Sequence, residues 1–428
     1  MVRKDVAAII LGLLVIYHVN GRPHPEVDVV AAPYTAWSLV RSGWLDLRPY
    51  PELKRYVSTI IRELPDGSWV SMRPPGAALV AAPFVAPFVL LRERPLRDID
   101  MLHLGKLVAA VCVASAAALF FIVSKRLMLT PAWPATVLFA LGTTLYSVAS
   151  QALWMHGPAT FWLCCALFFL TRDDADSGMC SSATGLALGL AILTRPSTAL
   201  FALGTGITFI IQRRWRGLTG LILGGAVPLA FLVGLNTLQF GHPLLGGYVT
   251  DNWKESPPLW VGLGGLLIAP SRGLLVYSPA LLLAPLGVRV LLTSRDDRLN
   301  SMRVLLLAWL LASAATVLFY ARWHDWRGGW TYGPRFLTET MPVLCLLFGL
   351  GYASLRAAWP RRIALGLISL SVAIHFVGVF GYSGYGAWQR RHELPDQGRN
   401  LFSLEDTQIE AHTRALLSKL AGTNPRRR

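Results

Sequence analysis

Two ionisable residues stand beside apolar segments, where a charge is expensive and is by default a candidate for function. Asp28 follows the first apolar run, and Arg73 precedes Pro74-Pro75-Gly76, which opens the second. A carboxylate at a membrane surface could take a proton from a hydroxyl group or hold a divalent cation. A guanidinium there could form paired hydrogen bonds with phosphate oxygens. The plainer alternatives are a helix cap or a solvated loop charge for Asp28, and a lipid-headgroup contact for Arg73.

Aromatic, glycine and charged residues are concentrated in two further segments, residues 270–279 and 322–335. Interfacial aromatic residues commonly form a belt at the membrane surface. Arginine, aspartate and glycine packed between them suggest instead a pocket for a sugar face and an anion. For the anion, we predict contacts from Arg272 and Arg335. For a sugar or acceptor, we predict contacts from His156, Arg195, Tyr248, Asp325, Arg327 and Tyr332. A single histidine at a helix end, such as His156, is more often structural.

The composition shows which kind of scaffold must position these residues. The chain has 428 residues, of which 54% are hydrophobic and 15% charged, whereas a soluble domain is typically about one quarter charged. Apolar runs recur from residue 6 to residue 382 and are continuous, whereas barrel strands alternate. These features predict an all-α polytopic membrane protein and exclude a soluble enzyme.

Candidate membrane spans follow from the apolar runs. They cover residues 6–19, 76–91, 105–124, 133–150, 156–171, 183–194, 198–211, 218–235, 272–292, 304–321, 337–354 and 363–382. The formal net charge of +16 comes largely from short Lys/Arg clusters beside these runs, and such clusters usually hold loops on the cytoplasmic side. We therefore expect about 11–13 transmembrane helices in the inner (plasma) membrane, with the N-terminus inside. The cationic surplus then reflects topology and membrane lipids, and nucleic acid is not an expected partner.

Residues 20–75 form the longest polar interruption, with seven Lys/Arg and six Asp/Glu. A near-balanced loop of this length can be translocated, so we predict a large first extracytoplasmic loop. Two stretches in it, residues 31–42 and 53–63, have apolar residues at helical spacing and predict amphipathic helices. We thus divide the chain into a transmembrane domain, residues 1–388, and a polar C-terminal tail, residues 389–428, with a short helix near residues 405–420.

The order of these features resembles a known family. The early acidic Asp28, the stretch Ser-Leu-Val-Arg-Ser-Gly-Trp-Leu-Asp-Leu at residues 38–47, and the basic-Pro-Pro-Gly element at Arg73 resemble the GT-C membrane glycosyltransferases. These enzymes use polyprenyl-phosphate sugars and include protein O-mannosyltransferases and the aminoarabinose transferases of lipid A. The resemblance extends from residue 1 to about residue 340. Residues 1–388 would then form a GT-C-like helical bundle.

The resemblance implies roles for two residues. Asp28 matches the first-loop acidic residue that serves as catalytic base or metal contact, and Arg73 matches the basic residue, often lysine, on the carrier phosphate. The family commonly has a second acidic residue, whereas Val27, Val29 and Met72 stand beside these positions here. A divalent cation therefore stays possible but is not required by the sequence.

The implied activity is transfer of a sugar, with inversion, from a polyprenyl-phosphate donor to an extracytoplasmic acceptor. Asp28 would act as base, and the active site would face the extracytoplasmic side. Arg73, helped by Arg272 or Arg335, would stabilise the departing carrier phosphate. The sugar and the acceptor, whether protein, lipid or glycan, stay open. The alternative function is a transporter or flippase for a lipid-linked glycan, which would use similar arginine-lined helices without turnover. Transporters often contain internal repeats, and none is visible in this sequence.

Overall fold

A computed structural model describes residues 2–24, 26–127, 131–248, 256–382, 388 and 399–422. Nearly all regular structure in this part of the chain is helical, and the expected all-α polytopic architecture is confirmed. Five helical segments of the described chain are long and apolar enough to cross a membrane, by length and composition: Asp98–Arg126 (α5), Trp215–Phe240 (α10), Asp297–Ala321 (α14), Arg335–Ser354 and Ala358–Gly381 (α16). Shorter apolar helices accompany them. The chain is an integral multi-pass membrane protein.

The chain divides into two compact units that are each built from separate stretches of sequence. Unit 1 comprises Met1–Leu13, Ala117–Val148 and Asn252–Arg428, and unit 2 comprises Leu14–Ala116 and Ala149–Asp251. The boundaries fall within two helices, α1 (Val2–His18) and α5. Asp28 and Arg73 therefore belong to unit 2, whereas the aromatic segments after residue 269 belong to unit 1.

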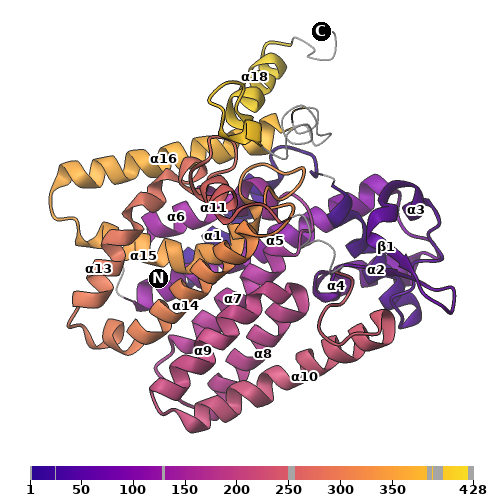
Figure 1. Ribbon diagram of the computed structural model, residues 1–428, viewed down its shortest axis with the longest axis horizontal. Coiled ribbons are helices and arrows are strands. Elements are labelled where there is room, and N and C mark those ends of the chain that lie inside the picture. Colours follow the sequence, from indigo (N-terminus) through magenta and orange to yellow (C-terminus); the bar gives the residue numbers. More distant parts are fainter. Residues whose placement is uncertain are drawn as a thin grey trace. The chain divides into compact units, whose positions relative to one another are not determined.

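Unit 2 contains a layer of closely packed helices. Its helices are α2 (Val27–Ser42), α3 (Glu52–Val57), α4 (Gly76–Leu91), α7 (His156–Leu170), α8 (Gly178–Thr194), α9 (Ala199–Ile211) and α10, with the 3₁₀ turns Ser58–Ile60 and Pro196–Thr198. Helices α7, α8 and α10 lie side by side (Figure 1). A Cβ atom added to Gly185 would lie 2.8 Å from the Leu221 carbonyl carbon, so the α8 and α10 backbones touch. Such close approach is what small residues provide inside a bilayer.

The polar segment 20–75 holds a two-stranded antiparallel sheet, β1 (Ile61–Glu63) and β2 (Trp69–Ser71). The amphipathic helix predicted over residues 53–63 is therefore wrong in its second half, because α3 ends at Val57. Residues 57–61 are mostly β-branched, and an Asp66-Gly67 turn follows in which Gly67 has φ +79°. Both features favour a hairpin over a continued helix.

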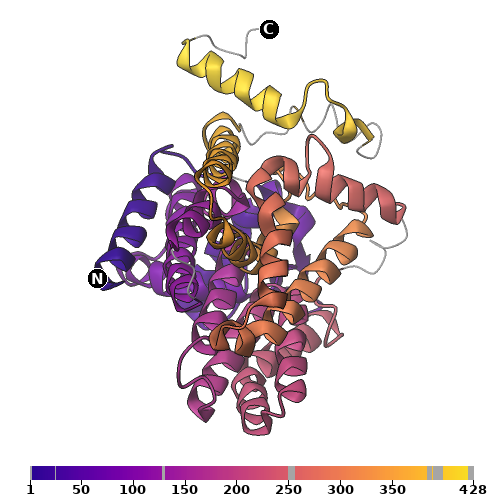
Figure 2. The ribbon, with the colours of Figure 1, turned by 90° about the vertical axis from the view of Figure 1, so that its left-hand side faces the viewer.

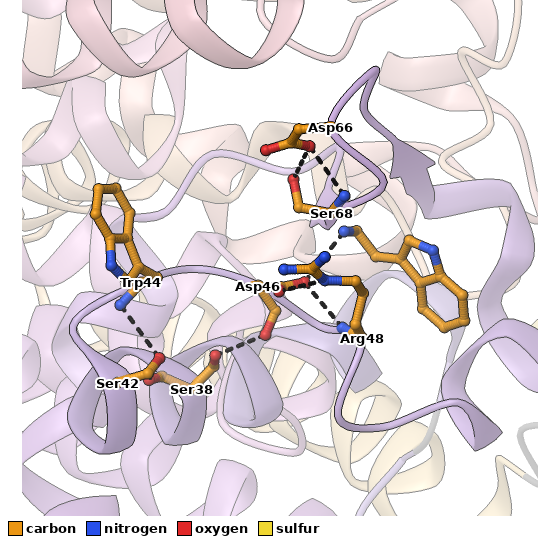
Figure 3. A network of polar contacts seen from close by, with 8 residues as sticks. Ser38, Ser42, Trp44, Asp46, Arg48, Asp66 and Ser68 are labelled. Atoms are coloured by element: carbon orange, nitrogen blue, oxygen red, sulfur yellow. Dashed lines mark hydrogen bonds and ion pairs between the residues drawn. The ribbon is translucent and has the colours of Figure 1, made fainter.

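The carboxylate of Asp46 fastens this hairpin to the end of α2 (Figure 3). It accepts hydrogen bonds from the Arg48 main-chain N–H at 3.0 Å, the Arg48 Nε at 2.6 Å and the Trp69 main-chain N–H at 3.1 Å. The main-chain carbonyl of Asp46 accepts from the Ser38 hydroxyl at 2.6 Å. Burial raises the pKa of Asp46, but the Arg48 and Trp69 donors outweigh it, so this pKa lies below its usual value. The motif at residues 38–47 thus has a structural task.

Unit 1 contains shorter and more broken helices. They are α6 (Trp133–Leu141), the π-helical turn Leu145–Ala149 that ends at the unit boundary, α11 (Leu259–Ile268), α12 (Leu274–Tyr277), the 3₁₀ turn Pro279–Leu283, α13 (Ala284–Thr293), α14, the 3₁₀ turn Arg335–Thr340, α15 (Met341–Ser354) and α16. The span predicted over residues 272–292 is broken before Pro279, because a proline inside a helix removes a hydrogen bond and clashes with the preceding turn. The glycine-rich α11 was not expected from the sequence.

Part of the C-terminal tail packs onto unit 1. A 3₁₀ turn, Arg399–Phe402, precedes α18 (Gln408–Leu420), which contacts α16 and can be followed in yellow in Figure 2. Gln408 is fully buried: its Oε1 accepts from the Tyr277 hydroxyl at 2.8 Å and the Gly333 N–H at 2.9 Å, and its Nε2 donates to the Thr331 carbonyl at 2.8 Å. Residues 389–398 and 423–428 of the predicted tail lie outside the described residues. The division at residue 388 stays a prediction.

Candidate active site

Asp28 and Arg73 form an ion pair in unit 2, although 45 residues separate them. Arg73 donates from Nε at 3.0 Å and from Nη2 at 2.6 Å, both to Asp28 Oδ1. The Arg73 and Asp28 side chains are 28% and 19% exposed. The pair is therefore sheltered yet reachable from outside.

Local structure explains how the carboxylate is held. Glu26 is extended, and α2 begins at Val27, so Asp28 lies in the first helical turn. The unsatisfied N–H groups at a helix N-terminus favour a negative charge there. The alternative considered from the sequence, that Asp28 caps a helix beginning near residue 31, is wrong. Helix α2 begins at Val27, so Asp28 lies inside it.

A hollow opens beside this ion pair. The polar or charged residues in its lining are Asp28, Thr35, Ser71 and Arg73, and the segment before α7 contributes the apolar Leu153 and Met155. Arg73 and the two prolines after it also line a second hollow, whose other walls come from α10 and residues 244–248. Because a single guanidinium borders both hollows, a ligand in either one can reach the same cation.

Gly76 brings α8 close to Arg73. A Cβ atom at Gly76 would lie 2.6 Å from the Thr194 backbone nitrogen, which is closer than real Cβ contacts allow. Arg195, the residue after Thr194, is 4% exposed and lies near enough for its charge to lower the pKa of Arg73. The Gly of the basic-Pro-Pro-Gly element therefore permits two cations to approach one site.

Gly247 lets the loop after α10 approach the backbone beside Arg73 in the same way. A Cβ atom there would lie 2.6 Å from the Met72 Cα, and the next residue, Tyr248, places its ring centroid 5.9 Å from the Arg73 Cζ. Burial lowers the pKa of Arg73, but Asp28 and Tyr248 raise it more strongly, so the net shift is upward. Arg73 thus stays a cation at any physiological pH, as a phosphate contact requires.

We expect Gly76→Ala to destabilise unit 2 by about 1–3 kcal/mol, because the added methyl group forces the α4 and α8 backbones apart. The matched control is Gly234→Ala in α10, where a Cβ atom meets nothing within 4 Å. There the better helix propensity of alanine should leave stability unchanged or slightly higher. Thermal unfolding of both purified variants in detergent checks this, and equal midpoints would contradict the close approach.

His156 is not among the residues that line the hollow. It is the first residue of α7, is 1% exposed and has its ring centroid 6.3 Å from that of Trp154. The neighbouring Met155 lines the hollow. A sugar or acceptor contact from His156 stays a prediction.

The remaining predicted residues belong to unit 1. Arg272 is fully buried and holds the turn at residues 328–333: its Nη1 donates to the Thr331 and Gly333 carbonyls at 2.5 and 3.1 Å, and its Nη2 donates to the Gly329 carbonyl at 2.9 Å. Gly328, Gly329 and Gly333 all have positive φ, which lets these carbonyls converge. The guanidinium therefore has a structural task here, and its predicted phosphate contact stays untested.

Tyr332 and the charged residues around it are also engaged within unit 1. The Tyr332 hydroxyl donates to the Ile374 carbonyl at 3.0 Å, and its ring is 1% exposed between Tyr277 and Tyr382. Asp325 pairs with Arg327 at 3.3 Å, and Arg335 is 8% exposed with its Cζ 5.1 Å from the Phe336 ring centroid. Substrate roles for these residues remain predictions.

Sequence reasoning missed one buried cation near the candidate site. Lys106 stands alone in the predicted span 105–124 and is 1% exposed in the structure. Its position inside an apolar run was a signal that could have found it, because intramembrane charges are rare and commonly functional.

The residues at the ion pair do not make a metal cage. No group of three or more His, Cys, Asp or Glu side chains that could hold a metal occurs in the described residues. The Oδ1 atom of Asp28 accepts two hydrogen bonds from the Arg73 guanidinium. The sequence neighbours of Asp28, Val27 and Val29, offer no metal ligand. A divalent cation held by one carboxylate together with a substrate phosphate, as is common for Mg²⁺, stays a prediction.

Comparison with known proteins bears on the fold. No family model and no curated protein matches the sequence. Among solved structures, the chain is similar to the crystal structure of ArnT from Cupriavidus metallidurans bound to undecaprenyl phosphate. The TM-score is 0.52 and the sequence identity 16%, with 98% of this chain and 77% of that chain covered. The chain has a GT-C-type membrane fold. The all-helical GT-C-like bundle expected from the resemblance is therefore confirmed at the level of fold.

Proposed function

We propose that this protein is a membrane glycosyltransferase that transfers a sugar from a polyprenyl-phosphate carrier to an acceptor on the extracytoplasmic side. The observation that carries the proposal is the sheltered Asp28–Arg73 pair beside a polar hollow. The fold also supports the proposal, because the chain shares it with ArnT, whose crystal structure holds undecaprenyl phosphate. The sugar and the chemical class of the acceptor are left open.

The charges around the hollow favour an anionic ligand. Arg73 and the nearby Arg195 supply two positive charges against the single negative charge of Asp28. A phosphodiester carries one negative charge at the membrane surface and an apolar chain below it. Entering the hollow, its phosphate would take the Arg73 guanidinium from Asp28, because a guanidinium forks equally well onto phosphate and carboxylate.

This exchange links donor binding to activation of the base. While Arg73 is paired with Asp28, the carboxylate is a poor proton acceptor, since protonating it would leave a cation without its partner. Once the phosphate holds Arg73, Asp28 is released to accept a proton. Donor binding would therefore come before deprotonation of the acceptor.

The transfer step follows from these positions. The acceptor hydroxyl gives its proton to Asp28 while its oxygen forms a bond with the anomeric carbon. The bond between that carbon and the phosphate oxygen breaks, and the carrier phosphate leaves with one additional negative charge. Arg73 stabilises this developing charge. A single displacement of this kind inverts the anomeric centre.

A test with purified protein in liposomes separates this function from its alternative. The protein is incubated with radiolabelled undecaprenyl-phosphate sugars and candidate acceptors, and binding of unlabelled undecaprenyl phosphate is measured in parallel. We expect saturable binding and release or transfer of the sugar. Movement of the intact lipid between leaflets without cleavage would instead establish a flippase, and absence of undecaprenyl-phosphate binding would overturn both readings.

A further inference from the structure

Lys106 is a buried cation held by two neutral oxygen atoms. It lies on α5, and its Nζ donates to Asn20 Oδ1 and, at 2.6 Å, to the Arg22 carbonyl. In the part of the chain that the structure describes, no carboxylate forms an ion pair with it. A buried ammonium is costly in an apolar medium, so its retention in a spanning helix calls for a specific task.

The ammonium sets the direction of a chain of amides. It can only donate, so Asn20 must present its oxygen to Lys106 and its Nδ2 to the next partner. That partner is Gln151, whose Oε1 accepts from Asn20 at 2.9 Å. Gln151 in turn donates from Nε2 to the Ser150 hydroxyl at 2.8 Å. One charged group thus orients two amide side chains, the partly buried Asn20 and the fully buried Gln151.

This node of Lys106, Asn20 and Gln151 joins two segments next to residues that line the hollow. Asn20 and Arg22 lie in the loop after α1 that leads into α2 and Asp28. Gln151 lies in the segment before α7 that supplies Leu153 and Met155 to the wall of the hollow. A main-chain hydrogen bond from the His24 N–H to the Gln151 carbonyl, at 3.0 Å, links the same two segments a second time.

We infer that Lys106 is a positioning residue that acts through Asn20 and Gln151. It holds Asp28 and the lining residues Leu153 and Met155 at the separation that transfer requires. The inference rests on the proposed function. Arg73 follows β2 and is not part of this node, so Lys106 governs the placement of the base and leaves the phosphate contact to Arg73.

The test is Lys106→Met, with transfer expressed per undecaprenyl-phosphate binding site. We expect kcat to fall by about 100-fold, as a displacement of about 1 Å in a reacting group can cause. The affinity for undecaprenyl phosphate should change by less than about threefold, because Arg73 keeps its place. Lys125→Met, near the other end of the same helix, is the matched control and should retain wild-type kcat. A wild-type kcat per binding site in Lys106→Met would overturn the inference, since a merely structural role lowers only the number of sites.

A double-mutant cycle with Asn20→Ala shows whether Lys106 acts through the node. If it does, the double variant should lose no more than about threefold beyond Lys106→Met alone, because both changes break the same connection. Losses that multiply would contradict the inference. If Lys106→Met fails to fold, Asn20→Ala and Gln151→Ala carry the same expectation while keeping the charge. Failure of the wild-type chain to bind undecaprenyl phosphate would count against the proposed function instead.

Discussion

Asp28→Asn should abolish sugar transfer, with a loss of about 1000-fold or more, and at the same time bind undecaprenyl phosphate more tightly than the wild-type protein. The loss follows because an amide cannot accept the proton of the acceptor hydroxyl, and a positioned base contributes about 10²–10⁴ in rate. The gain follows because Asp28 competes with the phosphate for Arg73, which it holds at 2.6 Å, and also repels it. We expect the dissociation constant to fall by about tenfold, equivalent to about 1.4 kcal/mol.

The measurements are transfer of radiolabelled sugar and equilibrium binding of undecaprenyl phosphate, both with purified protein. Asp66→Asn is the matched control: Asp66 lies in the same polar segment, residues 20–75, where it accepts from the Ser68 N–H and hydroxyl at 2.9 and 2.6 Å. Asparagine can accept the same bonds, so this variant should behave as the wild type. Undiminished transfer by Asp28→Asn removes the carboxylate from the mechanism. Unchanged binding would show that phosphate and carboxylate do not compete for one guanidinium.

Arg73→Gln is expected to weaken both binding and transfer. Loss of one well-placed cation from a leaving phosphate costs about 2–4 kcal/mol of transition-state stabilisation, or roughly 30- to 1000-fold in kcat/KM. Arg73→Lys should fall between the two proteins, because an ammonium keeps the charge but lacks the forked pair of N–H groups that now reach Asp28. We expect both binding and transfer to decrease in the order wild type, Arg73→Lys, Arg73→Gln.

Arg41→Gln provides the comparison for this series. Arg41 is an exposed residue in the last turn of α2, in the same polar segment, and it does not line the hollow, so its loss removes one charge there. If Arg41→Gln and Arg73→Gln lowered undecaprenyl-phosphate affinity equally, general attraction of anions would account for binding and the specific role of Arg73 would be wrong. The comparison is made at several salt concentrations, because screening weakens exposed charges most.

The helical membrane architecture could be predicted from the sequence because it depends on a local quantity. Each apolar run is favourable in a bilayer by itself, and its backbone hydrogen bonds close within the helix. Helices therefore occur near the bounds of most predicted spans, including α4 at Gly76–Leu91 and α7 at His156–Leu170. These two belong to the shorter apolar helices and not to the five segments of the described chain that are long enough to cross a membrane. The failures are equally local in origin: Pro279 breaks a span, and the β-branched residues near Ile61 with the turn at Gly67 replace a predicted helix by a hairpin.

The sequence by itself also marked Asp28 and Arg73 as candidates, because charged residues at the ends of apolar segments need a reason to be there. Only the tertiary structure decided that the two meet. They pair across 45 residues, beside a backbone contact of Gly76 with Thr194. The hydrogen-bond partners of Lys106 likewise come from distant parts of the chain. The tertiary structure also decided that the Arg272 guanidinium donates to main-chain carbonyls of the turn at residues 328–333. Transfer free energy and helical periodicity are summed over neighbouring residues, whereas partner choice depends on which backbones can approach, and no local pattern records that.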